Sequence, residues 1–340
     1  MDMVGEANDT TLESTGRRRF LKAAGVGSAV GLVGIPGLGA AQDGEFPSGD
    51  IEMICPWAAG GGTDRTARQL ASLAGEQSDA SFFVTNQTGG SGSAGFRAAA
   101  NAEPNGQTVG VLTVEICTIS HLGIANITPD AFAPVMQYNF DPASLTVPED
   151  APYGTIEEFV SYAEENPGEV RISNSGIGAI WHLSAAQMAQ ATGIEVEHVG
   201  YDGGAPATQA VVNGEVEATT ASPAEVAPQV QDGPLQMLAV FGEERSDLFP
   251  DVPTLQERDI DVTIGAWRGL GVPEGTPDER VQALNETFQS VYESDEFQSF
   301  MEDNGFGLVN RSPEEYGEFM SSELDRFEGI VDELDIQEGS

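Results

Sequence analysis

The sequence predicts an α/β fold in which strands alternate with helices and pair in parallel. Short apolar runs, which are typical of buried strands, alternate along the chain with segments whose apolar residues recur at helical spacing. Several loops that join a strand to the next helix are rich in glycine and small polar residues. These loops begin near residues 56, 174 and 201, and they are the candidate functional parts of the chain.

The first strand–loop–helix unit shows the pattern most clearly. A strand is predicted over 51–55, where apolar residues alternate, and a helix follows the loop. Its apolar face consists of Ala67, Leu70, Ala71 and Ala74. The loop contains Gly60–Gly62 followed by Thr63 and Asp64. Glycine lets the backbone approach a ligand closely, and a helix start offers unpaired N–H donors and a partial positive charge. The loop therefore predicts an anion site; a tight turn with Thr63 or Asp64 as a helix cap is the structural alternative.

The rest of the chain continues the alternation. The expected strands are 82–86, 108–113, 135–140, 145–147, 170–173, 194–199, 216–219, 235–241 and 265–272. The expected helices are 94–102, one opened by the capping box Thr155-x-x-Glu158, 179–191, 206–213, one after Pro223, 277–293, 296–304 and 312–334.

Composition indicates a protein adapted to high salt. The 340 residues contain 55 Asp plus Glu against 14 Lys plus Arg, a formal charge of −41, and Lys22 is the only lysine. In molar salt the Debye length is about 3 Å, so the repulsion among these charges is screened. This surface is typical of halophilic proteins, and basic residues are too few for a nucleic-acid partner. The length is sufficient for two domains.

Residues 1–41 are predicted to be a twin-arginine signal peptide. The run 17–22, Arg-Arg-Arg-Phe-Leu-Lys, matches the pattern R-R-x-F-L-K. A small-residue apolar run over 23–38 follows, and 39–41 is a suitable cleavage site. Pro36 and several glycines make the run unsuitable as a membrane span. The leader predicts export in the folded state to the cell surface or the medium. No cysteine lies near the cleavage site, so we expect no lipid-anchor signal.

The two cysteines, Cys55 and Cys117, both follow apolar runs. Two buried free thiols are the default interpretation, and a disulfide between them is the alternative.

One glycine pattern resembles a dinucleotide-binding fingerprint. Gly90-x-Gly92-x-x-Gly95 fits G-x-G-x-x-G, and Glu115 lies 20 residues beyond Gly95. The glycines do not follow the preceding strand directly, because 87–89 intervene. An exported protein is also not in contact with the cell's pool of nicotinamide dinucleotides. We therefore expect no dinucleotide here.

Catalytic and metal-binding patterns are not found in the sequence. No pair among His121, His182 and His198 has metal-ligand spacing. Ser173 and Ser175 precede His182, but no nucleophile–base–orienter set accompanies them, and His182 is interpreted as a packed or hydrogen-bonded residue. We expect no metal, no cofactor and no enzymatic activity. An exported α/β hydrolase or a dehydrogenase is the enzyme alternative, which a turnover assay would distinguish from ligand binding.

Motifs along most of the chain resemble the extracytoplasmic substrate-binding receptors of tripartite tricarboxylate transporters, the TctC or Bug family. They are Pro56–Asp64, Asn86 with Gly89–Gly95, Pro104–Gly106, Phe132–Val135, Asn166–Gly168, Ser173–Gly176 with His182–Leu183, His198–Tyr201, Pro250–Leu255 and Pro273-x-Gly275-Thr276-Pro277. The resemblance covers about 51–336. It implies a two-lobed, Venus-flytrap fold of the type II periplasmic-binding-protein class, each lobe a mixed sheet flanked by helices. Lobe 1 is expected from 51–113 plus 236–340, and lobe 2 from 114–235.

The resemblance also implies which residues bind the ligand. They are Trp57, Ala59, Gly60, Gly61, Gly62, Thr63 and Asp64 in the first loop, Ser173, Asn174, Ser175, Gly176, Gly178, Ala179 and His182 at the second, and Tyr201, Gly203, Gly204 and Ala205 in the third. Two departures bear on ligand identity. Ala58 and Ala59 replace the family's prolines, and Asp202 stands where the family usually has lysine.

The function that follows is capture of a small organic anion, a di- or tricarboxylate or a related carboxylate, by a monomeric receptor. The receptor would deliver it to the permease subunits of a tripartite tricarboxylate-type transporter. A ligand-sensing receptor that feeds a signalling partner is the alternative. No arginine lies in the three loops, so backbone N–H groups of 61–64, 176–179 and 203–205 are expected to hold the carboxylate. The hydroxyls of Thr63 and Ser175 are expected to assist, and Arg65 to matter less.

Overall fold

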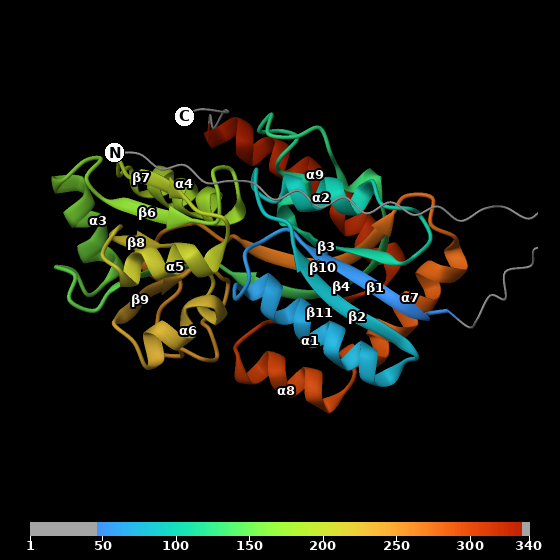
Figure 1. Ribbon diagram of the computed structural model, residues 1–340. Helices are drawn as coiled ribbons and strands as arrows, with labels where there is room; N and C mark the ends of the chain where they lie inside the picture. The colour runs from blue at the N-terminus through green and yellow to red at the C-terminus, as the bar shows by residue number, and fades with distance from the viewer. Residues whose placement is uncertain (1–45, 335–340) are drawn as a thin grey trace, which may run out of the picture. The chain divides into compact units, whose positions relative to one another are not determined.

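The computed structural model describes residues 46–334 (Figure 1). The leader predicted over residues 1–41 lies outside the described residues. Within 46–334, no helix combines the length and the apolar character needed to cross a membrane.

The first sheet has six strands in the order β11-β4-β10-β3-β1-β2. The strands are β1 (Gly49–Cys55), β2 (Ala80–Asn86), β3 (Thr108–Thr113), β4 (Phe132–Pro142), β10 (Gly265–Pro273) and β11 (Leu308–Arg311). β1 pairs in parallel with β2 and β3, whereas β10 is antiparallel to both β3 and β4. Every residue of β10 is buried, and its sequence is apolar or small apart from Arg268, as expected of a central strand covered on both faces.

The second sheet has five strands in the order β7-β6-β8-β5-β9. They are β5 (Ser144–Pro148), β6 (Arg171–Asn174), β7 (Glu197–Gly200), β8 (Ala218–Thr219) and β9 (Leu235–Val240). β6 is parallel to β7 and β8, and β5 is antiparallel to β8 and β9. Both sheets are therefore mixed, as the family resemblance implied. The parallel pairing expected from the strand–helix alternation is wrong for β4, β5, β9, β10 and β11, which pair antiparallel. The predicted order of strands and helices is confirmed, except that β11 was not predicted.

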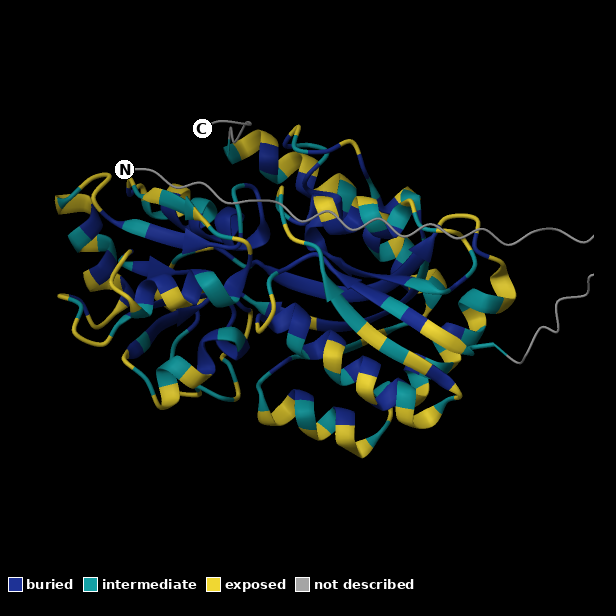
Figure 2. Cartoon of the chain, viewed as in Figure 1, coloured by how far each residue is buried: buried dark blue, intermediate teal, exposed yellow. Residues whose placement is uncertain are grey.

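Helices cover the faces of both sheets. They are α1 (Gly62–Gln77), α2 (Ser93–Ala100), α3 (Ile156–Glu165), α4 (Ile180–Thr192), α5 (Gly204–Val212), α6 (Pro223–Gln231), α7 (Asp278–Tyr292), α8 (Asp295–Asp303) and α9 (Pro313–Leu334). α1, α7 and α8 contribute to the hydrophobic cluster on one face of the six-stranded sheet, and α2 and α9 to the cluster on the other. Figure 2 shows the central strands buried, the edge strand β2 partly exposed, and the outer faces of the helices exposed.

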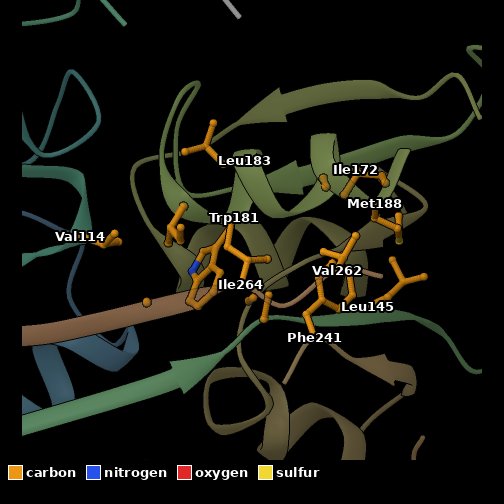
Figure 3. Packing of buried hydrophobic residues seen from close by; sticks show 14 of the residues in the cluster. Val114, Leu145, Ile172, Trp181, Leu183, Met188, Phe241, Val262 and Ile264 are labelled. Atoms are coloured by element: carbon orange, nitrogen blue, oxygen red, sulfur yellow. The ribbon is translucent and has the colours of Figure 1, made fainter. Parts of the chain in front are cut away.

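The larger hydrophobic cluster includes residues of both sheets. It extends from Leu112 and Val114 at the end of β3 to Leu145 of β5 and Ile172 of β6. Figure 3 shows Trp181 of α4 within this cluster. α4 is thereby packed where the two sheets approach each other, and its first residues face the loops that follow β1 and β6.

Of the capping box predicted at α3, the Thr155 half is present, and Glu158 reaches one residue further back than the motif requires. Thr155 Oγ1 accepts the Glu158 N–H at 3.2 Å, and the Glu158 carboxylate accepts the Gly154 N–H at 2.8 Å. The N-terminus of α3 is therefore closed by its own side chains.

Two strands lie in a different sheet from the one that the expected lobe boundaries imply. β4 falls within 114–235, yet it pairs with β10 and β11 in the six-stranded sheet. β9 continues past residue 236, yet it pairs with β5 in the five-stranded sheet. The sequence could not show this, because the partners of both strands are remote in sequence. Which residues move together as a lobe remains a prediction.

Cys55 and Cys117 are both buried free thiols, so the default interpretation is confirmed and the disulfide is not formed. The Cys55 thiol lies 3.6 Å from the Trp57 carbonyl oxygen, and the Cys117 thiol lies 3.4 Å from that of Met320.

Candidate ligand-binding site

The three glycine-rich loops predicted from the sequence meet between the two sheets. The Ala58 N–H donates to the Asp202 carbonyl oxygen at 2.9 Å, which joins the first loop to the third. Ser91 Oγ donates to the Ile177 carbonyl oxygen at 2.6 Å, which holds the second loop against the turn before α2. The third loop also contacts the second, because the Tyr201 N–H donates to the Asn174 carbonyl oxygen at 2.9 Å.

Asp64 organises the first loop. Helix α1 begins at Gly62, with Gly61 as an N-cap that has no side-chain hydrogen bond. Asp64, at the third helical position, reaches back and accepts the Gly60 N–H at 2.9 Å. It also accepts hydrogen bonds from Arg68 and Asn86. Although burial opposes ionisation, these hydrogen bonds hold the pKa of Asp64 below its ordinary value. Asp64 thus ties the loop to the start of α1 through the N–H directly before the N-cap, rather than through the N-cap N–H of a capping box.

A buried arginine enters the site from β10. Arg268 is 2 % exposed, and its Nε donates to Thr63 Oγ1 at 3.0 Å. Its Nη1 donates to Asn139 and Asp141, and its Nη2 lies 3.7 Å from Glu225 Oε1. Burial alone would lower the pKa of Arg268, but the charges of Asp141 and Glu225 outweigh it and raise the pKa. The site therefore contains a permanent cation that the loops themselves do not provide.

Glu225 of α6 lies on the start of α1. Its Oε1 accepts the Gly62 N–H at 2.8 Å, and its carboxylate lies against the α-carbon of Gly204 as well. A β-carbon at Gly62 or Gly204 would approach the Glu225 side chain to 2.9 or 2.7 Å. A β-carbon at Gly62 would also approach Arg268 Nη2 to 2.6 Å, so with Glu225 in this position a larger residue at either site would push a side chain aside.

A cavity of about 20 Å³ remains between the loops, room for about one water molecule. Its lining consists of Trp57, Gly61, Gly62, Thr63, Thr113, Glu115, Ser175, Ile180, Trp181, Gly204, Glu225, Ala266 and Arg268. Pockets that hold small organic molecules measure about 300–1,000 Å³. A dicarboxylate can therefore enter only if the loops move apart.

Six of the residues predicted from the sequence line this cavity: Trp57, Gly61, Gly62, Thr63, Ser175 and Gly204. The Trp57 indole N–H donates to Thr113 Oγ1 at 3.2 Å, which fixes the ring. The Ser175 hydroxyl is buried and has no hydrogen-bond partner among the described residues. Ser175 therefore offers an unsatisfied polar group to whatever enters.

The other predicted residues of the second loop serve the loop itself. The Gly176 N–H donates to Asn174 Oδ1 at 3.1 Å, and the Ala179 N–H donates to the Gly176 carbonyl oxygen at 3.0 Å. Ser173 Oγ donates to the Ala207 carbonyl oxygen at 2.9 Å. The Gly178 N–H donates to His182 Nδ1 at 2.8 Å. These amides are engaged with protein acceptors in this structure.

His182 is packed and neutral. Its ring lies 4.4 Å from that of His198 in an edge-on arrangement. Burial, with a contribution from His198, lowers the pKa of His182 to about 3. The side chain is hydrogen-bonded, as the sequence analysis proposed.

The remaining predicted residues lie outside the cavity lining. Ala59 and Gly60 are exposed, and Tyr201 is half-buried, with its N–H donating to the Asn174 carbonyl oxygen at 2.9 Å. Gly203 is buried, its backbone in a conformation that favours glycine (φ 142°), and Ala205 is half-buried. The Asp202 side chain is exposed.

A second buried carboxylate lies at the start of α4. Glu115 Oε1 accepts the Ile180 N–H at 3.0 Å, and Glu115 also accepts a hydrogen bond from the Thr113 hydroxyl. Burial raises the pKa of Glu115, although these hydrogen bonds oppose the effect. Two of the helix N-termini expected to hold an anion thus already hold carboxylates of the protein.

Sequence reasoning missed Arg268, Glu225 and Glu115. An arginine inside an otherwise apolar strand was the available signal for Arg268, because a charge is seldom buried without a partner. Glu225 follows Ser222 at capping-box spacing, which suggests only a helix start. Arg65, expected to matter less, lies outside the cavity lining and donates to the Ala224 carbonyl oxygen at 3.3 Å.

Two mixed α/β halves with loops meeting between them define the class of the periplasmic binding proteins, and solved structures of that class share this fold. Residues 66–336 match the model of the tripartite tricarboxylate transporter family receptor, and the chain belongs to this family. The resemblance drawn from the sequence motifs is confirmed in this respect.

Three solved structures illustrate the similarity. A ligand-free TctC solute-binding protein from Polaromonas is 36 % identical, covers 85 % of this chain and 99 % of its own, and has a TM-score of 0.63. R. palustris Rpa4515 with adipate is 26 % identical over 86 % of this chain and 99 % of its own, with a TM-score of 0.82. MatC from Rhodopseudomonas palustris with bound malate is 25 % identical over 84 % and 100 %, with a TM-score of 0.80.

Proposed function

We propose that this protein captures a small organic anion, a di- or tricarboxylate or a related carboxylate, and delivers it to a tripartite tricarboxylate-type membrane transporter. The observation that carries the proposal is the buried guanidinium of Arg268 beside Thr63, at a cavity where the Ser175 hydroxyl finds no hydrogen-bond partner in residues 46–334. A cation and free hydroxyl donors in a place sheltered from solvent are suited to a carboxylate.

The similarity to ligand-bound proteins supports this ligand class. Adipate and malate, found in the two Rhodopseudomonas palustris structures, are both dicarboxylates. The loops of this chain meet around a cavity too small for such a molecule. Binding therefore requires opening and reclosure of the cleft, as in hinge-bending receptors.

The donors expected from the sequence remain part of the proposal, with Arg268 added. Thr63 Oγ1 accepts from Arg268, so its own hydroxyl hydrogen is free to point toward a ligand. Of the backbone N–H groups expected to bind the ligand, those of Gly61, Gly62, Thr63 and Gly204 belong to residues that line this cavity. Arg268 is shielded from salt because it is buried, so it retains its strength in molar salt where an exposed ion pair would not.

We place the mature receptor outside the cytoplasmic membrane as a halophilic monomer, exported through the twin-arginine pattern at Arg17 and Arg18. Replacing both arginines with lysine should leave the precursor inside the cell. Normal secretion of that double variant would contradict the export route.

Isothermal titration of the purified protein in molar salt with malate, succinate, adipate and citrate tests the ligand class. At least one of these should bind, and small-angle scattering at saturating ligand should show a compact closed form. Turnover of a carboxylate, or binding of none of them, would contradict a carboxylate receptor. Co-purification of permease subunits with the membrane-associated receptor tests delivery.

A further inference from the structure

We propose that the Glu225 carboxylate occupies the place of a ligand carboxylate, and that a bound ligand displaces it onto the start of its own helix. This place, the carboxylate subsite, consists of the Gly62 N–H, the Arg268 guanidinium and the α-carbons of Gly62 and Gly204. The inference rests on the proposed function, because it names the subsite that receives the ligand.

The carboxylate subsite is built to hold a carboxylate. Glu225 Oε1 lies 2.8 Å from the Gly62 nitrogen and 3.7 Å from Arg268 Nη2. Gly62 is the first residue of α1, so the helix N-terminus adds a partial positive charge. The absence of a side chain at Gly62 and Gly204 makes room for the carboxylate, since a β-carbon at either would approach Glu225 within 3 Å.

A second, independent observation at the same cavity also indicates a ligand. Ser175 is 4 % exposed, lines the cavity and has a hydroxyl without a partner among residues 46–334. Buried hydroxyl groups are nearly always hydrogen-bonded. A ligand oxygen that entered beside the carboxylate subsite would provide the missing partner.

The start of α6 offers the displaced Glu225 carboxylate an alternative hydrogen-bond partner. Ser222-Pro223-Ala224-Glu225 has the spacing of a capping box, with Ser222 as the N-cap of α6. Within the described residues the Ser222 N–H has no protein acceptor, while Glu225 Oε2 lies 3.5 Å from Ser222 Oγ. At α3 the matching residue, Glu158, reaches back to the Gly154 N–H, one residue before the N-cap. A change of side-chain rotamer would let Glu225 reach the nearer N–H, that of its own N-cap Ser222.

This exchange explains how a strongly acidic protein admits an anion. One carboxylate replaces another beside Arg268, so the subsite keeps the same number of charges and needs no additional cation. A neutral or cationic group would leave the Gly62 N–H without an anion and Arg268 with Asp141 as its remaining carboxylate partner in the subsite. The subsite therefore selects a ligand with at least one ionised carboxylate.

Two variants of Glu225 and one matched control test the inference, with titration of malate, succinate, adipate and citrate in molar salt. Glu225→Gln removes the charge at nearly constant shape, and carboxylate affinity should rise by about tenfold, because a neutral acceptor holds the Gly62 N–H less strongly. Glu225→Asp keeps the charge but is shorter by one bond of about 1.5 Å. The shorter carboxylate should no longer accept the Gly62 N–H but should still cap α6. The Glu225→Asp variant should therefore bind the carboxylates more tightly, by a similar factor.

Glu158→Gln is the control, because Glu158 occupies on α3 the helical position that Glu225 occupies on α6, but lies away from the cavity. The affinities of this variant for the four carboxylates should equal those of the wild type. A crystal structure of the complex should place the ligand carboxylate on the Gly62 N–H and Glu225 about 3 Å from the Ser222 nitrogen. Thermal melting of each variant verifies that it is folded.

The outcomes separate this inference from the proposed function. A gain in Glu225→Gln with none in Glu225→Asp would show that only charge repulsion is relieved, and would overturn displacement. Wild-type binding with no gain in either variant would also overturn displacement, but would leave the carboxylate receptor standing. Binding of none of the four carboxylates by any variant would overturn both.

Discussion

Replacing Arg268 with methionine should destabilise the fold severely. The side chain of Arg268 and that of its partner Asp141 are each 2 % exposed, and Glu225 lies on the other side of the guanidinium. Methionine fills similar space but leaves two buried carboxylates without a counter-ion. Removing one partner of a buried ion pair costs about 3–5 kcal/mol in free energy of unfolding.

Removing the negative partner as well should restore part of that loss. Asparagine at position 141 keeps an oxygen that can accept the Gly307 N–H, which donates to Asp141 at 2.8 Å. The double variant Asp141→Asn/Arg268→Met should therefore lose less stability than the sum of the single variants. A coupling of about 1–3 kcal/mol is expected for residues in one buried network.

Urea unfolding at constant molar salt, followed by circular dichroism and tryptophan fluorescence, measures all three variants. Arg258→Met is the control, because Arg258 and Glu157 form an exposed pair 3.6 Å apart with side chains 44 % and 54 % exposed. Its effect should lie within about 0.5 kcal/mol. If Arg268→Met were as mild as this control, or if the single effects simply added, the buried network would not be coupled.

Three further predictions concern binding, pH and salt. Thr63→Val should weaken carboxylate binding by roughly tenfold to a hundredfold, since it removes one hydroxyl that contacts a charged group; Arg65→Gln should matter less, and titration showing the reverse order would contradict this. The pKa of His182 is lowered to about 3, and unfolded histidine titrates near 6.5, so only the unfolded chain takes up this proton between these values. The free energy of unfolding should then fall as pH drops below 6.5, by about 2 kcal/mol from this residue at pH 5, and His182→Gln should flatten a denaturation series that covers this range. Dialysis from molar salt to about 0.1 M lengthens screening to about 10 Å, and circular dichroism should show unfolding; an unchanged cooperative fold would contradict halophilic adaptation.

Local patterns in the sequence were sufficient for the strand–loop–helix units. The alternation over 51–55, the run 265–272 and the capping box at Thr155 depend on neighbours within a few residues, and β1, β10 and α3 form where these patterns predict. The partners of β4 and β9 depend on which strands meet in space, and no local pattern encodes that choice. This is why the sheet assignment of these two strands differed from the expected boundaries.

The site divides in the same way. The glycine-rich loops were visible because their composition is unusual over a short stretch. Glu225 binds Gly62 across 163 residues of sequence, and its spacing from Ser222 already has a local explanation. In the sequence, Glu115 stood out only as the acidic residue of a dinucleotide-like pattern. In the structure it accepts a hydrogen bond at the start of α4. The polar groups missing from the prediction are those whose partners are remote in sequence.

The burial of the two cysteines has a consequence for the chemical durability of the protein. Burial raises the pKa of Cys55 to about 12 and that of Cys117 well above its ordinary value. Because the thiolate is the reactive form, only about one Cys55 in 10⁵ is reactive at pH 7. Cys55 also packs with Trp57 of its own loop and Ala179 of the facing loop. A reagent can reach this thiol only when those loops separate. The rate of Cys55 alkylation should therefore report how often the cleft opens.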